Sequence, residues 1–155
     1  MNNHELIKFK YLAILFLFFS CDLKGKESAN SLIKSELEKK AQFYYKNKDY
    51  LVAKKYFDTL LLKEPTNGEY YYKRAYSNYM LLNYDNEAIS DFMNSIKYNY
   101  KNQKGAYLTI GTIYRIHGKL DSALSFYNKA LIIDSSYEKA KSEKKEVLKI
   151  IEKLK

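Results

Sequence analysis

The sequence is poor in histidine and cysteine, two residue types that often carry out chemistry. It has two histidines, His4 and His117, and one cysteine, Cys21, among its 155 residues. His117 precedes Gly118 at the expected end of a helix, where an imidazole suits the helix dipole better than the role of a general base. One cysteine forms neither an intrachain disulfide nor an all-cysteine metal site.

The sequence also lacks the motifs that gather catalytic groups. It contains no glycine-rich phosphate loop, no zinc-protease helix motif and no nucleophile elbow. A reaction needs several acidic or basic groups in one place, and the sequence brings none together. We therefore expect a protein that is not an enzyme and that has no catalytic residue, no metal site and no cofactor. An enzyme is the alternative from a different functional class.

Cys21 has the setting of a residue that receives a lipid. Lys8 and Lys10 precede an uncharged apolar run over 11–19, and Ser20 and Cys21 follow that run. A basic segment, a short apolar run and a small residue are typical of a secretory signal peptide. Crossing a bilayer needs about 20 apolar residues, so this run is too short for a stable transmembrane helix.

The tetrapeptide Phe18-Phe19-Ser20-Cys21 resembles the lipobox of bacterial lipoproteins, although Leu is usual where Phe18 stands. The resemblance implies cleavage before Cys21 and acylation of its thiol. It also implies a lipid-anchored protein of the cell envelope that faces the periplasm, with the outer membrane as one candidate and the choice of membrane left open. We expect a signal peptide over 1–20 and a polar tether over 21–30. The alternative is an uncleaved amphipathic or signal-anchor helix with an incidental cysteine.

Composition and charge indicate one folded domain that does not bind nucleic acid. The sequence is 46% hydrophobic and 16% aromatic, which is enough for a continuous core. Its formal net charge is +9, from 27 basic and 18 acidic residues. The lysines alternate with glutamates along helical stretches, which is typical of a solvated helix face rather than of a nucleic-acid surface.

A repeat pattern organises the rest of the chain. Ala53, Ala88 and Ala123 lie 35 residues apart, and each is followed four residues later by an aromatic residue. That spacing places both side chains on one face of a helix. A helical stretch upstream of each alanine carries a bulky residue and then a small one four positions on. The bulky and small pairs are Leu37 and Ala41, Tyr71 and Ala75, and Tyr107 and Gly111.

Each unit therefore reads as a helical hairpin, and the chain resembles the tetratricopeptide repeat (TPR) family, whose unit has about 34 residues. The third unit carries the resemblance best, through Tyr107, Gly111, Tyr114, Ala123, Tyr127 and Ala130. The first unit has Pro65 where its second helix must stop. The middle unit departs most, because it has Asn78 on the inner stripe and one extra residue in its inter-helix turn.

The resemblance implies that the first helix of each hairpin lines a groove that binds a protein or peptide partner. Counting from the small residue of each unit places nine side chains on that face: Glu38, Gln42, Tyr45, Tyr72, Tyr76, Tyr79, Leu108, Thr112 and Arg115. Tyrosine suits adaptable binding because it joins a large apolar ring to a hydroxyl. The alternative is that some of these rings pack between hairpins. The basic clamp with which some TPR proteins hold a terminal carboxylate is not recognisable.

The sequence predicts an all-α fold, a short α-solenoid of three TPR-like hairpins within 31–136 and a C-terminal capping helix over 137–155. The hairpins are expected at about 34–67, 68–103 and 104–136. We expect the cap to cover Leu124, Tyr127 and Leu131 with four apolar residues, which are Val147, Leu148, Ile151 and Leu154. The predicted function is a membrane-anchored interaction module or scaffold. The alternative is an accessory subunit of an outer-membrane assembly or secretion machine.

Overall fold

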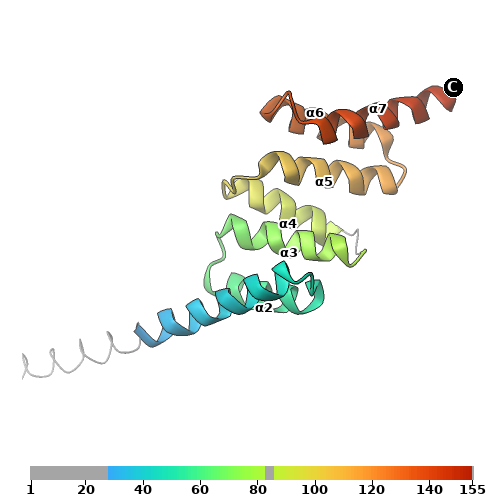
Figure 1. Cartoon of the computed structure of the whole chain (residues 1–155). Helices are drawn as coiled ribbons and strands as arrows, with labels where there is room; N and C mark the ends of the chain where they lie inside the picture. Colours follow the sequence, from blue (N-terminus) through green and yellow to red (C-terminus); the bar gives the residue numbers. More distant parts are fainter. Residues whose placement is uncertain (1–27, 83–85, 155) are drawn as a thin grey trace, which may run out of the picture. The chain divides into compact units, whose positions relative to one another are not determined.

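The computed structural model describes residues 28–82 and 86–154 (Figure 1). These residues form seven helical segments and no strand, which confirms the predicted all-α class. The segments are 28–46, α2 (Tyr50–Lys63), α3 (Gly68–Met80), α4 (Asn86–Lys97), α5 (Gln103–Ile116), α6 (Leu120–Ile133) and α7 (Glu138–Lys153). The predicted signal peptide, Cys21 and most of the predicted tether lie outside the described residues.

The chain divides into two compact units, Met1–Lys39 and Lys40–Lys155. In the first unit the described residues, 28–39, are helical, and Lys34 and Glu38 form an ion pair across one helical turn at 3.9 Å. The second unit holds the end of the first helix and all of α2 to α7. Among the described residues, no helix combines the length and the apolar composition that crossing a membrane requires.

Within the second unit each helix packs against its neighbours along the chain, α2 on α3, α3 on α4, and so on to α7 (Figure 1). Such one-dimensional stacking of hairpins defines an α-solenoid. Local sequence signals set the helix boundaries. The side chains of Asp49, Asn67 and Asn102 each accept a hydrogen bond from a backbone N–H in the first turn of α2, α3 and α5.

The repeated small and aromatic residues form the core of the hairpins, as their spacing predicts. Fully buried members of the pattern are Ala41, Ala53, Phe57, Ala75, Ala88, Phe92, Ala123 and Tyr127. The burial of Ala88 and Phe92 confirms the register predicted for the second helix of the central hairpin. Gly111 permits a close approach of α5 to α6, because a Cβ at this position would lie 2.6 Å from a ring carbon of Tyr127.

Helix α7 packs where the first helix of a further hairpin would lie, and it caps the last hairpin. Ala140 and Val147 are fully buried against a cluster that includes Leu108, Tyr127 and Ala130, and Ile151 packs at its edge. The expectation that Leu148 and Leu154 join this contact is wrong, since they are 42% and 76% exposed. Leu148 is turned by about 100° from Val147 on the helix, and Leu154 follows the last helical residue.

Candidate partner-binding face

The nine side chains predicted to line a partner-binding face have three different settings. Glu38 belongs to the first unit. Tyr72 and Leu108 lie in the core, where they are 9% and 4% exposed, so their packing role replaces the exposed role expected for them. Residues of the following helices pack over these two positions. The other six are half-buried on the second unit, namely Gln42, Tyr45, Tyr76, Tyr79, Thr112 and Arg115.

All four predicted tyrosines belong to a larger group of touching rings, here called the tyrosine cluster. It consists of Tyr45, Tyr50, Tyr72, Tyr76, Tyr79 and Tyr100. Tyr76 is its centre, with ring centroids 6.1 Å from Tyr45, 6.2 Å from Tyr50, 6.3 Å from Tyr72 and 6.1 Å from Tyr79. Aromatic contacts of this kind contribute about 0.5–1.5 kcal/mol each beyond their buried area.

Two members of the tyrosine cluster were not predicted from the first-helix count. Tyr50 begins α2, and Tyr100 lies in the turn before α5, where its ring centroid is 4.8 Å from that of Tyr72. Neither lies on a first helix, so a rule that reads one face of each first helix omits both. In the sequence, both residues are marked only as aromatic residues that stand next to a helix boundary.

Burial disfavours ionisation of three hydroxyls of the cluster, those of Tyr45, Tyr72 and Tyr100. Burial, followed by the nearby hydroxyls of other tyrosines, raises the pKa of Tyr45 and of Tyr72 above its usual value. Burial also raises the pKa of Tyr100. The Asn102 Nδ2 group donates a hydrogen bond to the Tyr72 hydroxyl at 2.8 Å. A protonated tyrosine hydroxyl both donates and accepts, so the cluster offers donors near its exposed edges.

The cation that touches the tyrosine cluster is already neutralised. The Lys73 ammonium donates to Glu69 Oε1 and to Gln42 Oε1, both at 2.5 Å. It also lies 5.6 Å from the centroid of the Tyr45 ring, a cation–π distance. Gln42, one of the predicted residues, therefore accepts a hydrogen bond from Lys73 that connects the first helix to α3.

Thr112 and Arg115 of α5 are engaged by the last two helices. Arg115 Nε lies 3.2 Å from Glu143 Oε2 of α7, an ion pair without the geometry of a hydrogen bond. The Tyr127 hydroxyl of α6 donates weakly to Glu143 Oε2 at 3.4 Å and to Thr112 Oγ1 at 3.5 Å. Glu143 of the capping helix thus contacts the polar side chains near the end of α5 and α6. The half-buried rings of the tyrosine cluster belong to the first two hairpins and the turn that follows them.

Comparison with solved structures identifies this architecture. An Arabidopsis OM64 TPR domain matches 76% of this chain and 95% of its own, with a TM-score of 0.68 and 23% sequence identity. The first TPR domain of Spaghetti (RPAP3), bound to the HSP90 peptide SRMEEVD, matches 76% of this chain and 92% of its own, with a TM-score of 0.68 and 21% sequence identity. The fold is that of a TPR domain. The TPR2B domain of yeast Sti1, in a complex with pHsp70, matches 75% of this chain and 96% of its own, with a TM-score of 0.65 and 21% sequence identity.

The sequence matches no protein-family model and no curated protein significantly. The likeness to solved TPR domains therefore rests on the arrangement of the helices. It covers about three quarters of the chain, 76% for the first two of these domains.

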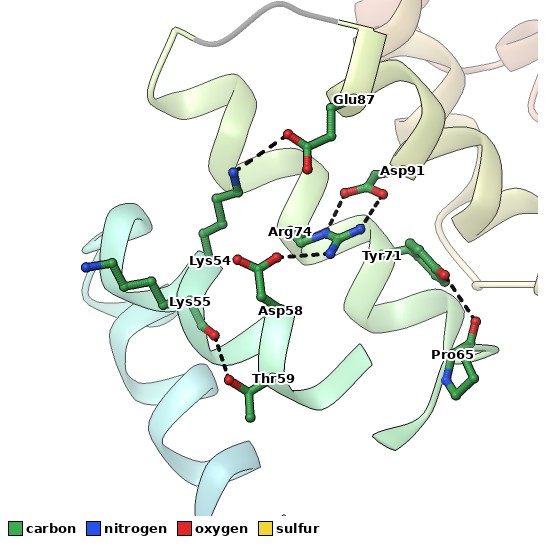
Figure 2. A network of polar contacts seen from close by, with 9 residues as sticks. All are labelled: Lys54, Lys55, Asp58, Thr59, Pro65, Tyr71, Arg74, Glu87 and Asp91. Atoms are coloured by element: carbon green, nitrogen blue, oxygen red, sulfur yellow. Dashed lines mark hydrogen bonds and ion pairs between the residues drawn. The ribbon is translucent and has the colours of Figure 1, made fainter. Parts of the chain in front are cut away.

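The central TPR hairpin contains a polar network that sequence reasoning missed (Figure 2). Arg74 of α3 binds Asp91 of α4 through two hydrogen bonds of 2.7 Å, and it donates a third, of 2.9 Å, to Asp58 of α2. Asp91 is buried, whereas Asp58 is at the surface. Burial raises the pKa of Asp91, and the Arg74 guanidinium acts against that shift. The network links the first hairpin to the second.

The position of Asp91 holds one ring of a stacked aromatic pair in each of the other two TPR hairpins. Tyr44 stacks on Tyr56 at 5.6 Å in the first, and Tyr114 stacks on Phe126 at 5.3 Å in the third. Asp91 lies 35 residues after Tyr56 and 35 before Phe126. The repeat period therefore carried a signal for this substitution, since an acid occupies a position where both other units have an aromatic ring.

Asn78 accompanies this replacement and is the polar residue noted on the inner stripe of the central hairpin. It is buried, and neither atom of its amide has a hydrogen-bond partner among the described residues. An unpaired buried amide costs about 1–3 kcal/mol. The described part of the central hairpin therefore contains a buried amide whose hydrogen-bonding capacity is unused.

Within residues 28–82 and 86–154, no group of three or more histidine, cysteine, aspartate or glutamate side chains is placed to hold a metal ion. The arrangement is suited to recognition through apolar rings and hydroxyls.

Proposed function

We propose that this protein is a protein-interaction module that binds a peptide segment of a partner on its tyrosine cluster, and that it is held in a bacterial cell envelope by a lipid on Cys21. One observation carries the binding role. Six tyrosines from the first helix, α2, α3 and the turn before α5 form a connected group of rings, and five of them remain partly accessible to solvent. Isolated exposed rings need no explanation, whereas a continuous group of them marks an interaction surface.

The physical properties of the cluster suit peptide recognition. A tyrosine ring contributes a large apolar area and loses little conformational entropy on binding, because it has only two side-chain torsions. Contacts within the cluster hold each ring in place before a partner arrives, which reduces the entropic cost of association. Aromatic residues near the centre of an interface tend to contribute most of the binding free energy.

The solved TPR domains that this chain resembles support the class of partner. The Spaghetti (RPAP3) domain is bound to an HSP90 peptide, and the yeast Sti1 domain is in a complex with pHsp70. The present chain shares their fold at low sequence identity, so the type of ligand is carried over as a proposal and its sequence is not.

The proposed location rests on the N-terminal sequence. A basic segment, a short apolar run and Ser20-Cys21 are the layout of a lipoprotein signal. Several acyl chains on one cysteine would hold the domain at the membrane almost permanently, since each buried methylene contributes about 0.8 kcal/mol. The anchor would raise the local concentration of the module near envelope partners.

Site-specific photocrosslinking tests the binding role. A photoreactive phenylalanine analogue at Tyr79 should crosslink the full chain to a defined partner band in envelope preparations. The matched control places the same analogue at Leu62, which is 86% exposed on α2 and is not part of the cluster. A band that forms only from position 79 supports the proposal, whereas a band that forms only from position 62 would move the binding site to the second helices.

A further inference from the structure

Building on the proposed function, we infer that Asn102 is a positioning residue of the partner-binding face. Its amide holds the ring of Tyr72, and through that ring it fixes the arrangement of the tyrosine cluster. Asn102 lies in the turn before α5 and is not itself a member of the cluster. The inference follows from the way its side chain differs from that of its counterpart in the preceding inter-hairpin turn, Asn67.

Asn67 and Asn102 lie 35 residues apart and precede the first helices of the second and third hairpins. The side-chain oxygen of each accepts a hydrogen bond from the backbone three residues on, which is the N–H of Tyr70 at 3.3 Å and the N–H of Gly105 at 3.2 Å. A side-chain oxygen in this position stabilises the start of a helix. Both asparagines therefore serve equally as helix caps.

The amide nitrogens of the two asparagines have different partners. Asn67 Nδ2 donates to Glu64 Oε2 at 2.9 Å, a contact within its own turn. Asn102 Nδ2 donates to the hydroxyl of Tyr72 at 2.8 Å, 30 residues away in the sequence. Capping requires only the side-chain oxygen, so this second bond is a separate function of Asn102. It joins the start of α5 to a ring on α3.

Tyr72 is the ring through which the tyrosine cluster contacts the core. It is 9% exposed, and it packs edge to face on the buried ring of Phe92 at a centroid distance of 5.5 Å. It also contacts two rings of the cluster, Tyr76 at 6.3 Å and Tyr100 at 4.8 Å. Because packed rings leave little free space, a shift of Tyr72 forces both neighbours to repack.

The turn that carries Asn102 is itself held in place. The N–H of Tyr100 donates to the carbonyl oxygen of Ser95 in α4 at 2.9 Å, and the carbonyl oxygen of Asn102 accepts from the backbone of α5. Gly105 leaves room for the amide, since a Cβ at this position would lie 2.5 Å from Asn102 Nδ2. The amide therefore projects from a fixed backbone, which allows one hydrogen bond to hold the ring in one place.

The reactivity of the Tyr72 hydroxyl tests the first step without any partner. The full chain in detergent micelles is treated with N-acetylimidazole at neutral pH, and acetylation of each tyrosine is followed by mass spectrometry of the peptides. In Asn102→Ser the cap is kept, but the side chain has no amide to donate. Loss of a bond of about 1 kcal/mol should raise the acetylation rate of Tyr72 about fivefold.

Two matched variants separate positioning from capping. Asn67→Ser makes the same change in the preceding turn and should leave Tyr72 as unreactive as in the wild type. Asn102→Asp keeps one oxygen for the cap and one to accept the proton of the Tyr72 hydroxyl, so it should restore the low rate. The buried Tyr127 reports on general unfolding and should stay unreactive throughout. A Tyr72 rate that is unchanged in Asn102→Ser, or equally raised in Asn67→Ser or Asn102→Asp, would overturn the inference.

The crosslink from position 79 connects the ring to binding. With the full chain at limiting concentration, Asn102→Ser should lower the crosslink yield about fivefold, because immobilising a loosened side chain costs about 1 kcal/mol on association. Asn67→Ser should leave the yield unchanged. An unchanged yield in Asn102→Ser would overturn the positioning role and leave the proposed function intact. If no version of the chain forms the crosslink, the proposed function fails, and acetylation alone decides whether Asn102 holds the ring.

Discussion

Single residues in the turns of this solenoid adopt backbone conformations that their side chains disfavour. Lys48 and Leu82 follow first helices with φ angles of 62°, and Gly118 occupies the corresponding turn of the third hairpin with φ of 72°. Only glycine adopts this left-handed region without steric cost, and helices commonly end on a glycine for that reason. The first two hairpins therefore carry a strain that the third avoids.

Exchanging these turn residues should change stability in opposite directions. Lys48→Gly should raise the free energy of unfolding by about 1 kcal/mol, and Gly118→Ala should lower it by a similar amount. A Cβ at Gly118 meets no atom within 4 Å, so the loss would come from backbone strain alone. Urea denaturation followed by circular dichroism measures both. A destabilised Lys48→Gly variant would show that the lysine side chain makes contacts that outweigh the strain.

Asp134 makes stability depend on acid pH. Hydrogen bonds from Lys104 and from the hydroxyl and backbone N–H of Ser136 lower the pKa of Asp134 from 3.8 to about 2. A carboxyl whose pKa is lower in the folded state stabilises the fold above its unfolded pKa and loses that contribution as pH falls through the folded value. The relevant window therefore runs from about pH 4 down to about pH 2.

The Asp134→Asn variant isolates that contribution. The wild type should lose more of its urea resistance than the variant when both are compared at about pH 4.5 and about pH 2.5. Lys104→Met removes the main hydrogen-bond partner of Asp134, so the pKa of Asp134 should move back toward that of an ordinary aspartate and the pH range of lost stability should narrow. Identical pH profiles for the wild type and Asp134→Asn would show that other carboxyls govern acid unfolding.

Cys21 is the residue on which the proposed location depends. Metabolic labelling with a palmitate analogue should mark the wild type and should not mark Cys21→Ala, because the thiol is the expected acceptor of the lipid. Fractionation should then find the variant outside the membrane pellet. Equal labelling of both proteins would remove the basis for a lipid anchor.

At the scale of the elements, the second hairpin has an ion-paired aspartate, Asp91, where each neighbouring hairpin has one ring of a stacked pair. Arg74 and Asp91 connect α3 to α4, and the bond from Arg74 to Asp58 connects them to α2 (Figure 2). A buried pair of this kind contributes little net stability compared with apolar side chains of similar size, but it is costly to break on one side only.

A pair of variants distinguishes these two effects. Asp91→Ala leaves the Arg74 guanidinium without its main partner and should destabilise the protein by about 3–5 kcal/mol. The double variant Arg74→Leu, Asp91→Phe replaces the ion pair by apolar side chains, and it should be close to the wild type in stability. Chemical denaturation gives both values. A double variant as unstable as the single one would show that the ion pair is required for hairpin packing.

At the scale of the whole solenoid, stability depends on how its last hairpin is covered. Val147 and Ala140 of α7 are fully buried against the core of the third hairpin. Because a repeat protein buries its hydrophobic faces only between neighbours, an uncovered last hairpin would expose Tyr127, Ala130 and Leu108 together.

Removing the cap should therefore reduce both stability and solubility. Truncation after Tyr137 should lower the melting temperature of the chain and promote aggregation. Val147→Ala, a milder change, should cost about 2 kcal/mol through lost burial and the cavity that remains. The control Leu154→Ser alters an exposed residue and should have little effect. A truncated chain with an unchanged melting temperature would contradict a capping role for α7.

The hairpin architecture was predictable because its signals are local and repeated. A period of 35 residues, an alanine and an aromatic four apart, and a small residue on each first helix specify which faces are apolar. Helix periodicity converts those spacings directly into buried stripes, so Phe57, Phe92 and Tyr127 were correctly placed inside. The lipid acceptor Cys21 stays a prediction, since it lies outside the described residues.

The tertiary structure decided which side chains of the predicted face are buried and which charges are paired. Tyr72 and Leu108 lie in the core because neighbouring helices cover them, and the spacing along one helix carries no information about that cover. Arg74 and Asp91 lie 17 residues apart in the sequence and meet only when α3 packs on α4. Helix spacing is a one-dimensional property and determined the hairpins, whereas contacts between helices depend on packing in three dimensions.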